Sequence, residues 1–579
     1  MKSYVNFRIN FFLIVVILLS GLVLYRLFIL SVVKHAAYSR TAQAQSENIN
    51  NILARGNIYL SDKDGDVFLA ATNKKFPLAH IVPSDIRSDK KNEAAEKLAL
   101  TLGLNKDDLT IKINSGSKSL KIIARRINNE QVEQIKNFKI KGVNVSYESD
   151  RYYSGDSLAA DVIGFLGYDV EGRRAGQYGL EGFYDEDLSG REPNIASLFN
   201  LVNPSFVFKL LGSFFEKESV KSEPNFDRPS DLVLTVDKNA QMFIEDKLKS
   251  LMEKWQAAGG TIIVQEPESG KIIAIADWPS FNPNSYSTVN PELFLNQSIQ
   301  GMYEPGSSFK PIIMAAGLDL SKITPQTIYE DTGFVSIAGY TIRNFSEKVF
   351  GRRTMSEVLE KSINTGTMFV ENLIGDENFL NYVVNMGFGQ NTGIDLPGEV
   401  SGNITNLYSG RKINYLTAAF GQGIAVTPLQ LLNAYSTIAN GGKLMRPYIV
   451  DKIIKERGQE IISKPEIVGI PISEKTAIKL QSMLVSVVDN GFDKARIKGY
   501  DIAGKTGTAQ IPDGKGGYSE HEFIHNFVGF APAHNAKFAI LIKMDKPKGI
   551  QFAADSLSPT FKEIAAFLLN YYNIPPTRQ

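Results

Sequence analysis

The chain has 579 residues, with 63 lysine and arginine side chains against 62 acidic ones, and it contains no cysteine. So long a chain needs more than one hydrophobic core, and roughly three or four structural units are expected. The net charge of +1 gives no sign of a nucleic-acid-binding surface, and the lack of cysteine excludes disulfides, thiol catalysis and cysteine metal sites.

The first predicted element is an apolar helix at residues 9–33. At about 1.5 Å per residue it would be roughly 37 Å long, enough to cross a bilayer core of about 30 Å. Lys2 and Arg8 favour a cytoplasmic amino end. A signal peptide cleaved near residues 42–44 is the alternative, but the length of the apolar run favours a retained anchor. We therefore expect a single-pass plasma-membrane protein, with residues 1–8 in the cytoplasm and the chain beyond the helix outside it.

Residues 34–192 have the mixed pattern of a separate α/β domain. Two alternating segments, 57–60 and 66–70, flank an Asp-Lys-Asp-Gly turn and predict a β-hairpin. Amphipathic patterns at 91–102 and 129–138 predict two short helices. We expect this domain, called the pedestal below, to lie between the membrane anchor and the rest of the chain.

Residues 193–230 form a linker insertion, in which an apolar stretch precedes a charged one. Its apolar part is interpreted as a helix buried against the pedestal, and docking on the membrane surface or on a membrane partner is the alternative.

Residues 231–573 have the pattern of a helix-and-sheet enzyme, followed by a short tail at 574–579. Segments 261–264 and 271–277 flank a turn and predict an antiparallel hairpin. Further expected elements are a strand at 537–543, a strand pair at 502–510 and 526–531, a helix that starts at Pro428 behind a Thr427 capping box, and a closing helix at 558–569.

The histidines predict no metal site. His521 and His525 are four residues apart, but they lack a helical or acidic setting beyond Glu522. We expect them to be solvated loop residues, and we predict neither a metal nor a cofactor.

Three short motifs in chain order predict a serine acyl-transfer site. They are Ser307-Ser308-Phe309-Lys310, Ser362-Ile363-Asn364 and Lys505-Thr506-Gly507-Thr508. A serine hydroxyl becomes a good nucleophile when a neighbouring group takes its proton, and a neutral lysine can do so. The pKa of Lys310 must then fall by roughly 3 from its usual value of about 10.4. Burial and a second cation, Lys505, both act in that direction, while Ser362 and Asn364 could relay a proton and orient Lys310.

The first motif is weak by itself, because Ser31, Ser88, Ser115 and Ser409 are also followed by lysine three residues later. The setting of Ser307 distinguishes it. A Pro-Gly turn precedes it, and Pro311 fits a helix only in the first turn, so Ser307 should lie at the amino end of a helix. Because residues three apart share one helix face, we expect the Lys310 amine to reach the Ser307 hydroxyl.

The third motif has a rival interpretation. Residues 499–506 satisfy the P-loop pattern G-x-x-x-x-G-K-[ST]. A P-loop needs a buried strand before the first glycine and a helix after the lysine, whereas polar residues precede and several glycines follow here. We therefore interpret 502–510 as a β-strand that lines a cleft.

The three motifs resemble those of penicillin-binding proteins and class A β-lactamases. The middle motif departs from Ser-Asp-Asn only at Ile363, and the residues that would do chemistry remain. Other segments resemble class B penicillin-binding proteins in particular: Gly393-Ile394-Asp395-Leu396-Pro397-Gly398-Glu399, Phe420-Gly421-Gln422-Gly423, Thr427-Pro428-Leu429-Gln430 and Asn526-Phe527-Val528-Gly529-Phe530-Ala531-Pro532.

The amino-terminal half carries the same resemblance. Arg55-Gly56-Asn57-Ile58, Arg151-Tyr152-Tyr153, Ile163-Gly164-Phe165-Leu166-Gly167 and Gly179-Leu180-Glu181-Gly182 are similar to the pedestal, or dimerisation, domain of that family, although Ser154 replaces a usual proline. The resemblance implies an α+β fold with an N-terminal transmembrane helix, the pedestal, and a penicillin-binding transpeptidase domain whose central antiparallel sheet is flanked by helices.

The resemblance also implies a mechanism. Ser307 attacks the carbonyl between two terminal D-alanines of a peptidoglycan stem peptide, Lys310 accepts its proton, and an amine of a second stem peptide resolves the acyl-enzyme into a cross-link. The backbone N–H groups of Ser307 and Thr508 would stabilise the oxyanion. Lys505, Thr506 and Thr508, with Gly507 between the threonines, would bind the terminal carboxylate of the substrate or of a β-lactam.

Other functions remain open on the sequence. A D,D-carboxypeptidase or β-lactamase-like hydrolase would share Ser307 and let water attack, and a non-catalytic penicillin-binding scaffold would keep the site. The pedestal and the anchor favour transpeptidation. No glycosyltransferase region is visible, so the resemblance implies a polytopic SEDS-type glycosyltransferase as a partner, in either division or elongation.

Overall fold

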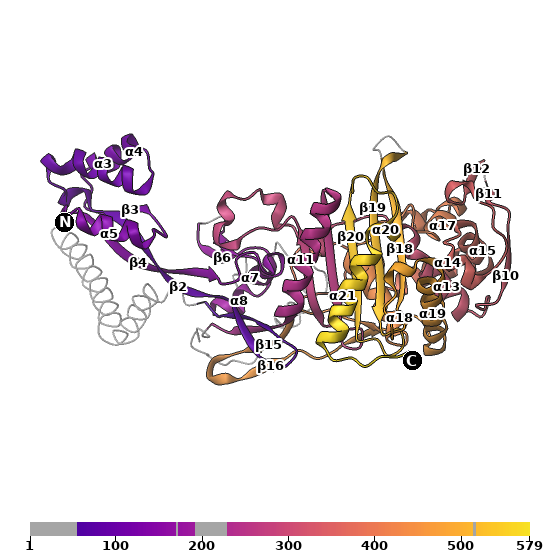
Figure 1. The fold of residues 1–579 in the computed structure, drawn as a ribbon. Coiled ribbons are helices and arrows are strands. Elements are labelled where there is room, and N and C mark those ends of the chain that lie inside the picture. Colours follow the sequence, from indigo (N-terminus) through magenta and orange to yellow (C-terminus); the bar gives the residue numbers. More distant parts are fainter. Residues whose placement is uncertain (1–54, 170–171, 191–228, 338, 513–516, 579) are drawn as a thin grey trace, which may run out of the picture. The chain divides into compact units, whose positions relative to one another are not determined.

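The computed structural model describes residues 55–578, apart from 170–171, 191–228, 338 and 513–516 (Figure 1). The predicted anchor at 9–33 and nearly all of the insertion at 193–230 lie outside the described residues. Among the helices that are described, none is both long and apolar enough to cross a membrane.

The described chain forms two compact units. One consists of Asn73–Asp150, and the other of Arg55–Thr72 together with the chain from Arg151 onward. The predicted pedestal at 34–192 is thus divided between the two units, because its first hairpin and its last segment pack with the carboxyl-terminal part.

The smaller unit is a layer of helices on a short sheet. Its elements are parts of β2 (Val67–Ile81) and β4 (Val143–Tyr153), with β3 (Lys121–Ala124), α3 (Lys91–Leu102), α4 (Lys106–Asn114) and α5 (Asn129–Asn137). Helices α3 and α5 confirm the two predicted amphipathic helices, and Asn128 caps α5 in a capping box with Gln131. Helix α4 was not predicted, because Leu109-Thr110-Ile111-Lys112-Ile113 alternates as a strand does. Asn105 fixes its start by accepting two backbone N–H bonds.

The larger unit contains the predicted hairpin of β1 (Ile58–Ser61) and β2, which pair antiparallel. Strand β1 also pairs in parallel with β7 (Asp231–Asp237), and β15 (Val450–Ile454) and β16 (Glu460–Ile462) continue this sheet. Two segments that are far apart in the sequence therefore share one sheet.

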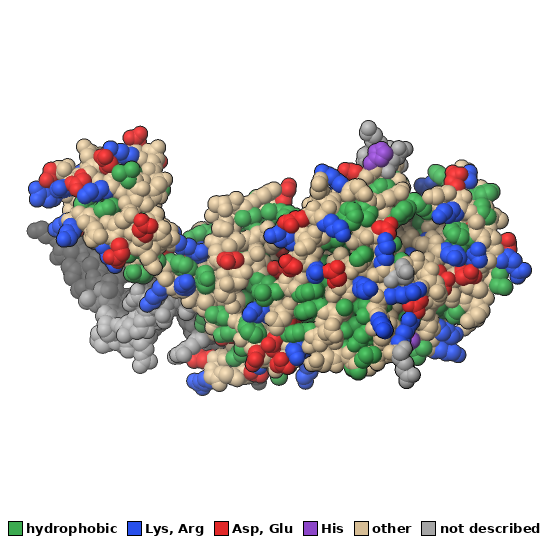
Figure 2. Space-filling model, viewed as in Figure 1, with side chains coloured by type: hydrophobic (Ala, Val, Ile, Leu, Met, Phe, Trp, Pro, Cys, Tyr) green, Lys and Arg blue, Asp and Glu red, His purple; other side chains and the backbone are tan. Residues whose placement is uncertain are grey.

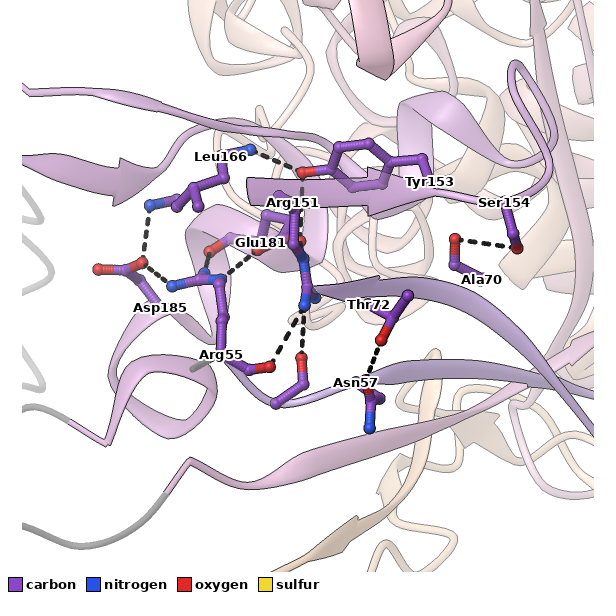
Figure 3. Close-up of polar contacts among 12 residues, drawn as sticks. Arg55, Asn57, Ala70, Thr72, Arg151, Tyr153, Ser154, Leu166, Glu181 and Asp185 are labelled. Carbon is purple, nitrogen blue, oxygen red and sulfur yellow. Dashed lines mark hydrogen bonds and ion pairs between the residues drawn. The ribbon is translucent and has the colours of Figure 1, made fainter. Parts of the chain in front are cut away.

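A buried ion network joins three of the segments that resemble the dimerisation domain (Figure 3). Glu181 accepts hydrogen bonds from Arg55 Nε at 2.5 Å and from Arg151 Nε at 2.6 Å. Asp185 accepts a further bond from Arg55 Nη1 at 2.7 Å, and the Tyr153 hydroxyl lies 3.3 Å from Glu181 Oε1. Burial alone would raise the pKa of Glu181, but the charges of Arg151 and Arg55 outweigh it and lower that pKa.

The second sheet of the larger unit has five antiparallel strands in the order β18-β19-β20-β8-β9. The strands are β8 (Gly259–Gln265), β9 (Ile272–Trp278), β18 (Ala503–Pro512), β19 (Tyr518–Ala531) and β20 (Phe538–Asp545), and they confirm the predicted strands and pairings. Strand β18 lies at the edge of this sheet.

Both faces of the five-stranded sheet are buried. Along β20, Ile540 and Ile542 pack into one core, whereas Ala539 and Leu541 pack into another. Helices α11 (Lys238–Trp255) and α21 (Ser558–Tyr571) cover the first face, and α18 (Pro428–Ala439) covers the second, with α13 (Lys310–Asp319) and α19 (Glu474–Ser486) packed beside it (Figure 1). Helix α18 begins with the predicted Thr427 capping box, and α21 confirms the predicted closing helix.

The remaining elements are short. They are α6 (Ala160–Ile163), β5 (Leu166–Tyr168), β6 (Arg174–Gly176), α7 (Gly179–Phe183), α8 (Asp185–Ser189), α12 (Gln297–Gln300), β10 (Ile328–Asp331), β11 (Phe334–Ile337), β12 (Tyr340–Arg343), β13 (Gly351–Thr354), α14 (Met355–Glu360), α15 (Asn364–Ile374), α16 (Asp376–Asn385), α17 (Lys412–Ala418), β14 (Leu444–Met445), β17 (Ile467–Gly469) and α20 (Ala553–Ser556). On the face drawn in Figure 2, basic and acidic side chains are interspersed among apolar ones, as the balanced composition leads one to expect.

Candidate active site

Ser307 lies in a tight 3-10 turn, Gly306–Phe309, that leads directly into α13. Buried hydrogen bonds hold the turn in place: Ser308 Oγ donates to the Pro305 carbonyl at 2.8 Å, and the Tyr435 hydroxyl donates to the Ser308 carbonyl at 2.7 Å. The Ser307 side chain is half-buried. The turn therefore presents one serine at the amino end of a buried helix, as the sequence predicts.

Lys310 is fully buried, and its amine lies among polar acceptors. Nζ donates to the Ser362 carbonyl at 2.5 Å, to Ser362 Oγ at 3.1 Å and to Asn364 Oδ1 at 2.7 Å. The predicted hydrogen bond between Lys310 and Ser307 is not among these. These acceptors belong to Ser362, just before α15, and to Asn364, its first residue. The Lys310 amine therefore bonds to this segment instead of to Ser307 on its own helix.

Burial, and then the nearby charge of Lys505, lowers the pKa of Lys310 well below its usual range. Burial also lowers the pKa of Lys505 to about 7. A desolvated lysine beside a second cation is the setting in which an amine becomes a base near neutral pH.

Ser362 lies between the two lysines. Lys505 Nζ is 3.2 Å from Ser362 Oγ, which also receives the bond from Lys310. The backbone of Ser362 is left-handed, with φ of +55°, which is uncommon and strained for a residue other than glycine. This conformation turns both the carbonyl and the hydroxyl of Ser362 toward Lys310.

Gly507 allows β18 to approach the Ser307 turn closely. A Cβ atom at Gly507 would lie 2.5 Å from the Pro305 carbonyl oxygen and 2.5 Å from Asn526 Nδ2. Asn526 Nδ2 in turn donates to the same Pro305 carbonyl at 3.0 Å, which ties β19 to the turn. Any larger residue at 507 would push the third motif away from the first.

Thr508 faces the same turn. A side chain at Gly306 would lie 3.2 Å from the Thr508 carbonyl oxygen. In a β-strand the N–H and the C=O of one residue point to the same side, so the Thr508 N–H also points toward the turn. The Thr508 hydroxyl accepts a hydrogen bond from the backbone N–H of Ala553 at 3.2 Å. The structure thus brings all three sequence motifs together.

Residues 260–566 match the family described as penicillin binding protein transpeptidase domain, and residues 53–196 match the penicillin-binding protein dimerisation domain. The chain belongs to the penicillin-binding protein transpeptidase family.

Two curated relatives and one solved structure illustrate the extent of this likeness. Stage V sporulation protein D of Bacillus subtilis is 33% identical over 88% of this chain and 77% of that protein. The peptidoglycan D,D-transpeptidase FtsI homolog of Mesostigma viride is 28% identical over 96% of this chain and 94% of its own length. Penicillin binding protein 3 from Mycobacterium tuberculosis, complexed with aztreonam, shares the fold with a TM-score of 0.67 at 23% identity, over 90% of this chain and 97% of that one.

Among the other Ser-x-x-Lys motifs of this penicillin-binding protein, the one at Ser409 serves as an internal comparison. Ser409 Oγ donates to a nearby backbone carbonyl, and Lys412 forms ion pairs with Glu371 at 2.5 Å and with Asp376 at 2.6 Å. Burial alone would lower the pKa of Lys412, but the hydrogen bonds to Asp376 and Glu371 outweigh it and raise that pKa. Two motifs with the same spacing therefore have oppositely shifted lysines, and only the Lys310 site favours a neutral amine.

The P-loop interpretation of residues 499–506 does not survive in the penicillin-binding protein fold. Lys505 and Thr506 lie inside β18, and the strand continues to Pro512 with no helix after the lysine. A phosphate-binding loop requires backbone N–H groups gathered at a helix start, which this segment lacks.

Sequence reasoning gave no role to three residues that shape the site. Asn526 and Gly421 lie in segments noted for their family resemblance, and Gly421 has φ of +82° and accepts a hydrogen bond from the Gly306 N–H at 3.0 Å. His525 was expected on a solvated loop, and this expectation is wrong. It is fully buried in β19, directly opposite Thr508 in the sheet. Helix α20 covers it.

Proposed function

We propose that this chain is a peptidoglycan D,D-transpeptidase in which Ser307 is the nucleophile and Lys310 the base. The observation that carries the proposal is the fully buried amine of Lys310, held by Ser362 and Asn364 beside a second lysine. The match to the transpeptidase domain and the names of the curated relatives support the same activity.

In the acylation step, Ser307 Oγ attacks the carbonyl carbon of the D-alanyl-D-alanine bond and its proton passes to the neutral amine of Lys310. The N–H groups of Ser307 and Thr508 stabilise the oxyanion, and each such donor is typically worth about 3 kcal/mol. The C–N bond then breaks, the proton reaches the departing amine of D-alanine through Lys310 and Ser362, and an ester on Ser307 remains.

In the second step, the amine of a neighbouring stem peptide attacks the ester. Lys310 accepts the proton from that amine, the new amide forms, and the proton returns to Ser307 Oγ as it leaves. In the resting site the Lys310 amine is hydrogen-bonded to Ser362 and Asn364. When the Lys310 amine loses one proton, its nitrogen gains a lone pair that can accept the proton of Ser307. The contacts to Ser362 and Asn364 therefore orient the amine and do not prevent it from acting as a base.

The terminal carboxylate of the substrate has a binding site at β18. Lys505 supplies charge, Thr506 and Thr508 supply hydroxyl groups, and Gly507 lets the strand lie against the Ser307 turn. A β-lactam carries an acidic group beside its reactive carbonyl and would occupy the same place. The similar penicillin binding protein 3 from Mycobacterium tuberculosis has been solved in complex with aztreonam, which supports β-lactam binding as such.

The proposal extends to location and partners. The apolar run at residues 9–33 supports a single membrane anchor with the catalytic domain outside the cytoplasm. By the resemblance to class B penicillin-binding proteins, we propose a membrane glycosyltransferase of the polytopic SEDS type as the partner that would supply its glycan strands.

The proposal predicts a single covalent adduct on Ser307. Full-length protein in detergent, treated with a fluorescent penicillin and examined by intact mass, should gain one adduct that Ser307→Ala abolishes. The matched control is Ser409→Ala, which removes the serine of the Ser-x-x-Lys motif at residues 409–412 and should label as the wild type does. No adduct on folded wild-type protein would leave the scaffold function in its place, and hydrolysis of a donor peptide without transfer to an acceptor amine would establish a carboxypeptidase.

A pH profile tests the assigned protonation states. We expect the second-order rate constant for acylation to be bell-shaped. It rises as Lys310 loses its proton, at a pH far below 10.5, because the pKa of that buried amine is lowered. It falls as pH passes about 7, where Lys505 loses the charge that attracts the carboxylate. Lys505→Arg keeps its charge throughout and should remove the falling limb. A rate that climbs steadily to pH 10 in the wild type would contradict both assignments.

A further inference from the structure

His525 is a buried histidine that the proposed mechanism does not use. It lies on β19 opposite Thr508 of β18, so the two side chains project from the same face of the sheet. The ring is fully buried, and burial lowers its pKa to about 4, so it is neutral at physiological pH. It is thus neither a cation for the substrate nor a base near the reacting atoms.

The ring holds the short helix α20 against the sheet. His525 Nδ1 and Ser556 Oγ form a buried hydrogen bond of 2.9 Å, and the carbonyl of Gln551 lies close enough to raise the pKa of the ring slightly.

The same helix determines how the Thr508 hydroxyl points. The N–H of Ala553, the first residue of α20, donates to Thr508 Oγ1 at 3.2 Å. A hydroxyl has one proton and two lone pairs, and this contact occupies a lone pair. The hydroxyl proton is then directed away from α20 and remains available to a carboxylate oxygen.

We propose that His525 is a positioning residue for the carboxylate-binding hydroxyl of Thr508, acting through Ser556 and the first turn of α20. This inference rests on the proposed function, because it assumes that Thr508 binds the carboxylate of a D-alanyl-D-alanine substrate or a β-lactam. Three successive contacts would link this buried histidine to the ligand: His525 to Ser556, α20 to Thr508, and Thr508 to the ligand. His525 itself touches neither the substrate nor Ser307.

The test compares a penicillin with its methyl ester, which lacks the negative charge, on the full-length protein. We expect His525→Ala to lower the second-order acylation rate constant with benzylpenicillin by about tenfold, the factor that corresponds to roughly one ordinary hydrogen bond. The rate with the methyl ester should change less than twofold, so the preference for the acid over the ester falls. His525→Asn, whose amide offers both a donor and an acceptor near the position of Nδ1, should restore most of the preference.

Two further variants make the result decisive. Ser556→Ala removes the other half of the contact and should reproduce the loss, including where His525→Ala does not fold. Adding His525→Ala to Thr508→Ala should cause little further loss, because the two act through one hydroxyl. His80→Ala removes a similar contact, from Nδ1 to Ser146 Oγ at 3.2 Å, in the other unit, and should leave both rates unchanged.

Equal losses with the acid and the ester, or no loss with either, would overturn the inference. Failure of the underlying function has a different signature, since wild-type protein would then form no adduct on Ser307 with either compound. If the wild type forms the adduct and His525→Ala keeps the wild-type preference for the acid over the ester, only the positioning role of His525 is excluded. The proposed function then stands.

Discussion

Lys310→Met is expected to lower the rate of acylation by a penicillin by about 10⁴-fold, the upper end of what a positioned general base typically contributes. Methionine has nearly the length of lysine and fills the same buried space, but it cannot accept a proton. The effect should be on the rate of the covalent step, because the carboxylate site at Lys505 is intact. Stopped-flow quenching of protein fluorescence at increasing penicillin concentration separates that rate from binding.

The fold should tolerate this change. A buried polar amine is costly even when it is hydrogen-bonded, so its replacement by an apolar side chain of similar volume removes a desolvation cost together with three hydrogen bonds. Lys322→Met, at an exposed position just beyond α13, is the matched control and should acylate normally. Acylation by Lys310→Met within tenfold of the wild-type rate would mean that another group takes the proton of Ser307.

Glu181→Gln is expected to destabilise the larger unit by about 3–5 kcal/mol, the typical cost of removing one partner from a buried ion pair. The carboxylate of Glu181 compensates two buried guanidinium groups, those of Arg55 and Arg151, at 2.5 and 2.6 Å. A neutral amide has the same shape but lacks the negative charge that both guanidinium groups share. Urea unfolding followed by tryptophan fluorescence measures the loss, since Trp255 and Trp278 both lie in this unit.

Two controls define the meaning of that result. Glu186→Gln changes an exposed carboxylate on neighbouring α8 and should alter the free energy of unfolding by less than about 0.5 kcal/mol.

The contribution of Glu181 should also disappear in acid. Its pKa is lowered in the folded state, so the stabilisation is present above the unfolded-state pKa of about 4.3 and is lost as pH falls through the folded value. Equal stability of wild type and Glu181→Gln at neutral pH would show that the network holds nothing together.

The regular elements of the larger unit were predictable because local pattern and tertiary environment agree. Strands β8, β9 and β20 are continuous apolar runs, as strands buried on both faces must be. The Thr427 capping box fixes the start of α18 from four residues of sequence. Helix α4 was missed because its β-branched residues imitate a strand, and the helix is decided by packing against α3.

The candidate site was predictable in its residues but not in its contacts. The ordered motifs identify Ser307, Lys310 and Lys505, and the chain brings them together. The spacing along the helix shows that the Lys310 amine can approach Ser307. It does not show which other acceptors compete for that amine, so the hydrogen bonds to Ser362 could not be predicted. The left-handed backbone of Ser362 and the burial of His525 both depend on elements distant in sequence, and no local pattern signals either.

The place of β18 at the edge of its sheet has a consequence for selectivity. Within the described residues it pairs with β19 alone, so its other side offers main-chain donors and acceptors without a strand to meet them. An extended peptide laid along that side would gain hydrogen bonds through its own backbone, whatever its side chains. Such a template binds any suitably extended chain. On the proposed mechanism, discrimination among peptides then comes from their ends, where a free carboxylate would meet Lys505 and internal segments of other proteins have none to offer.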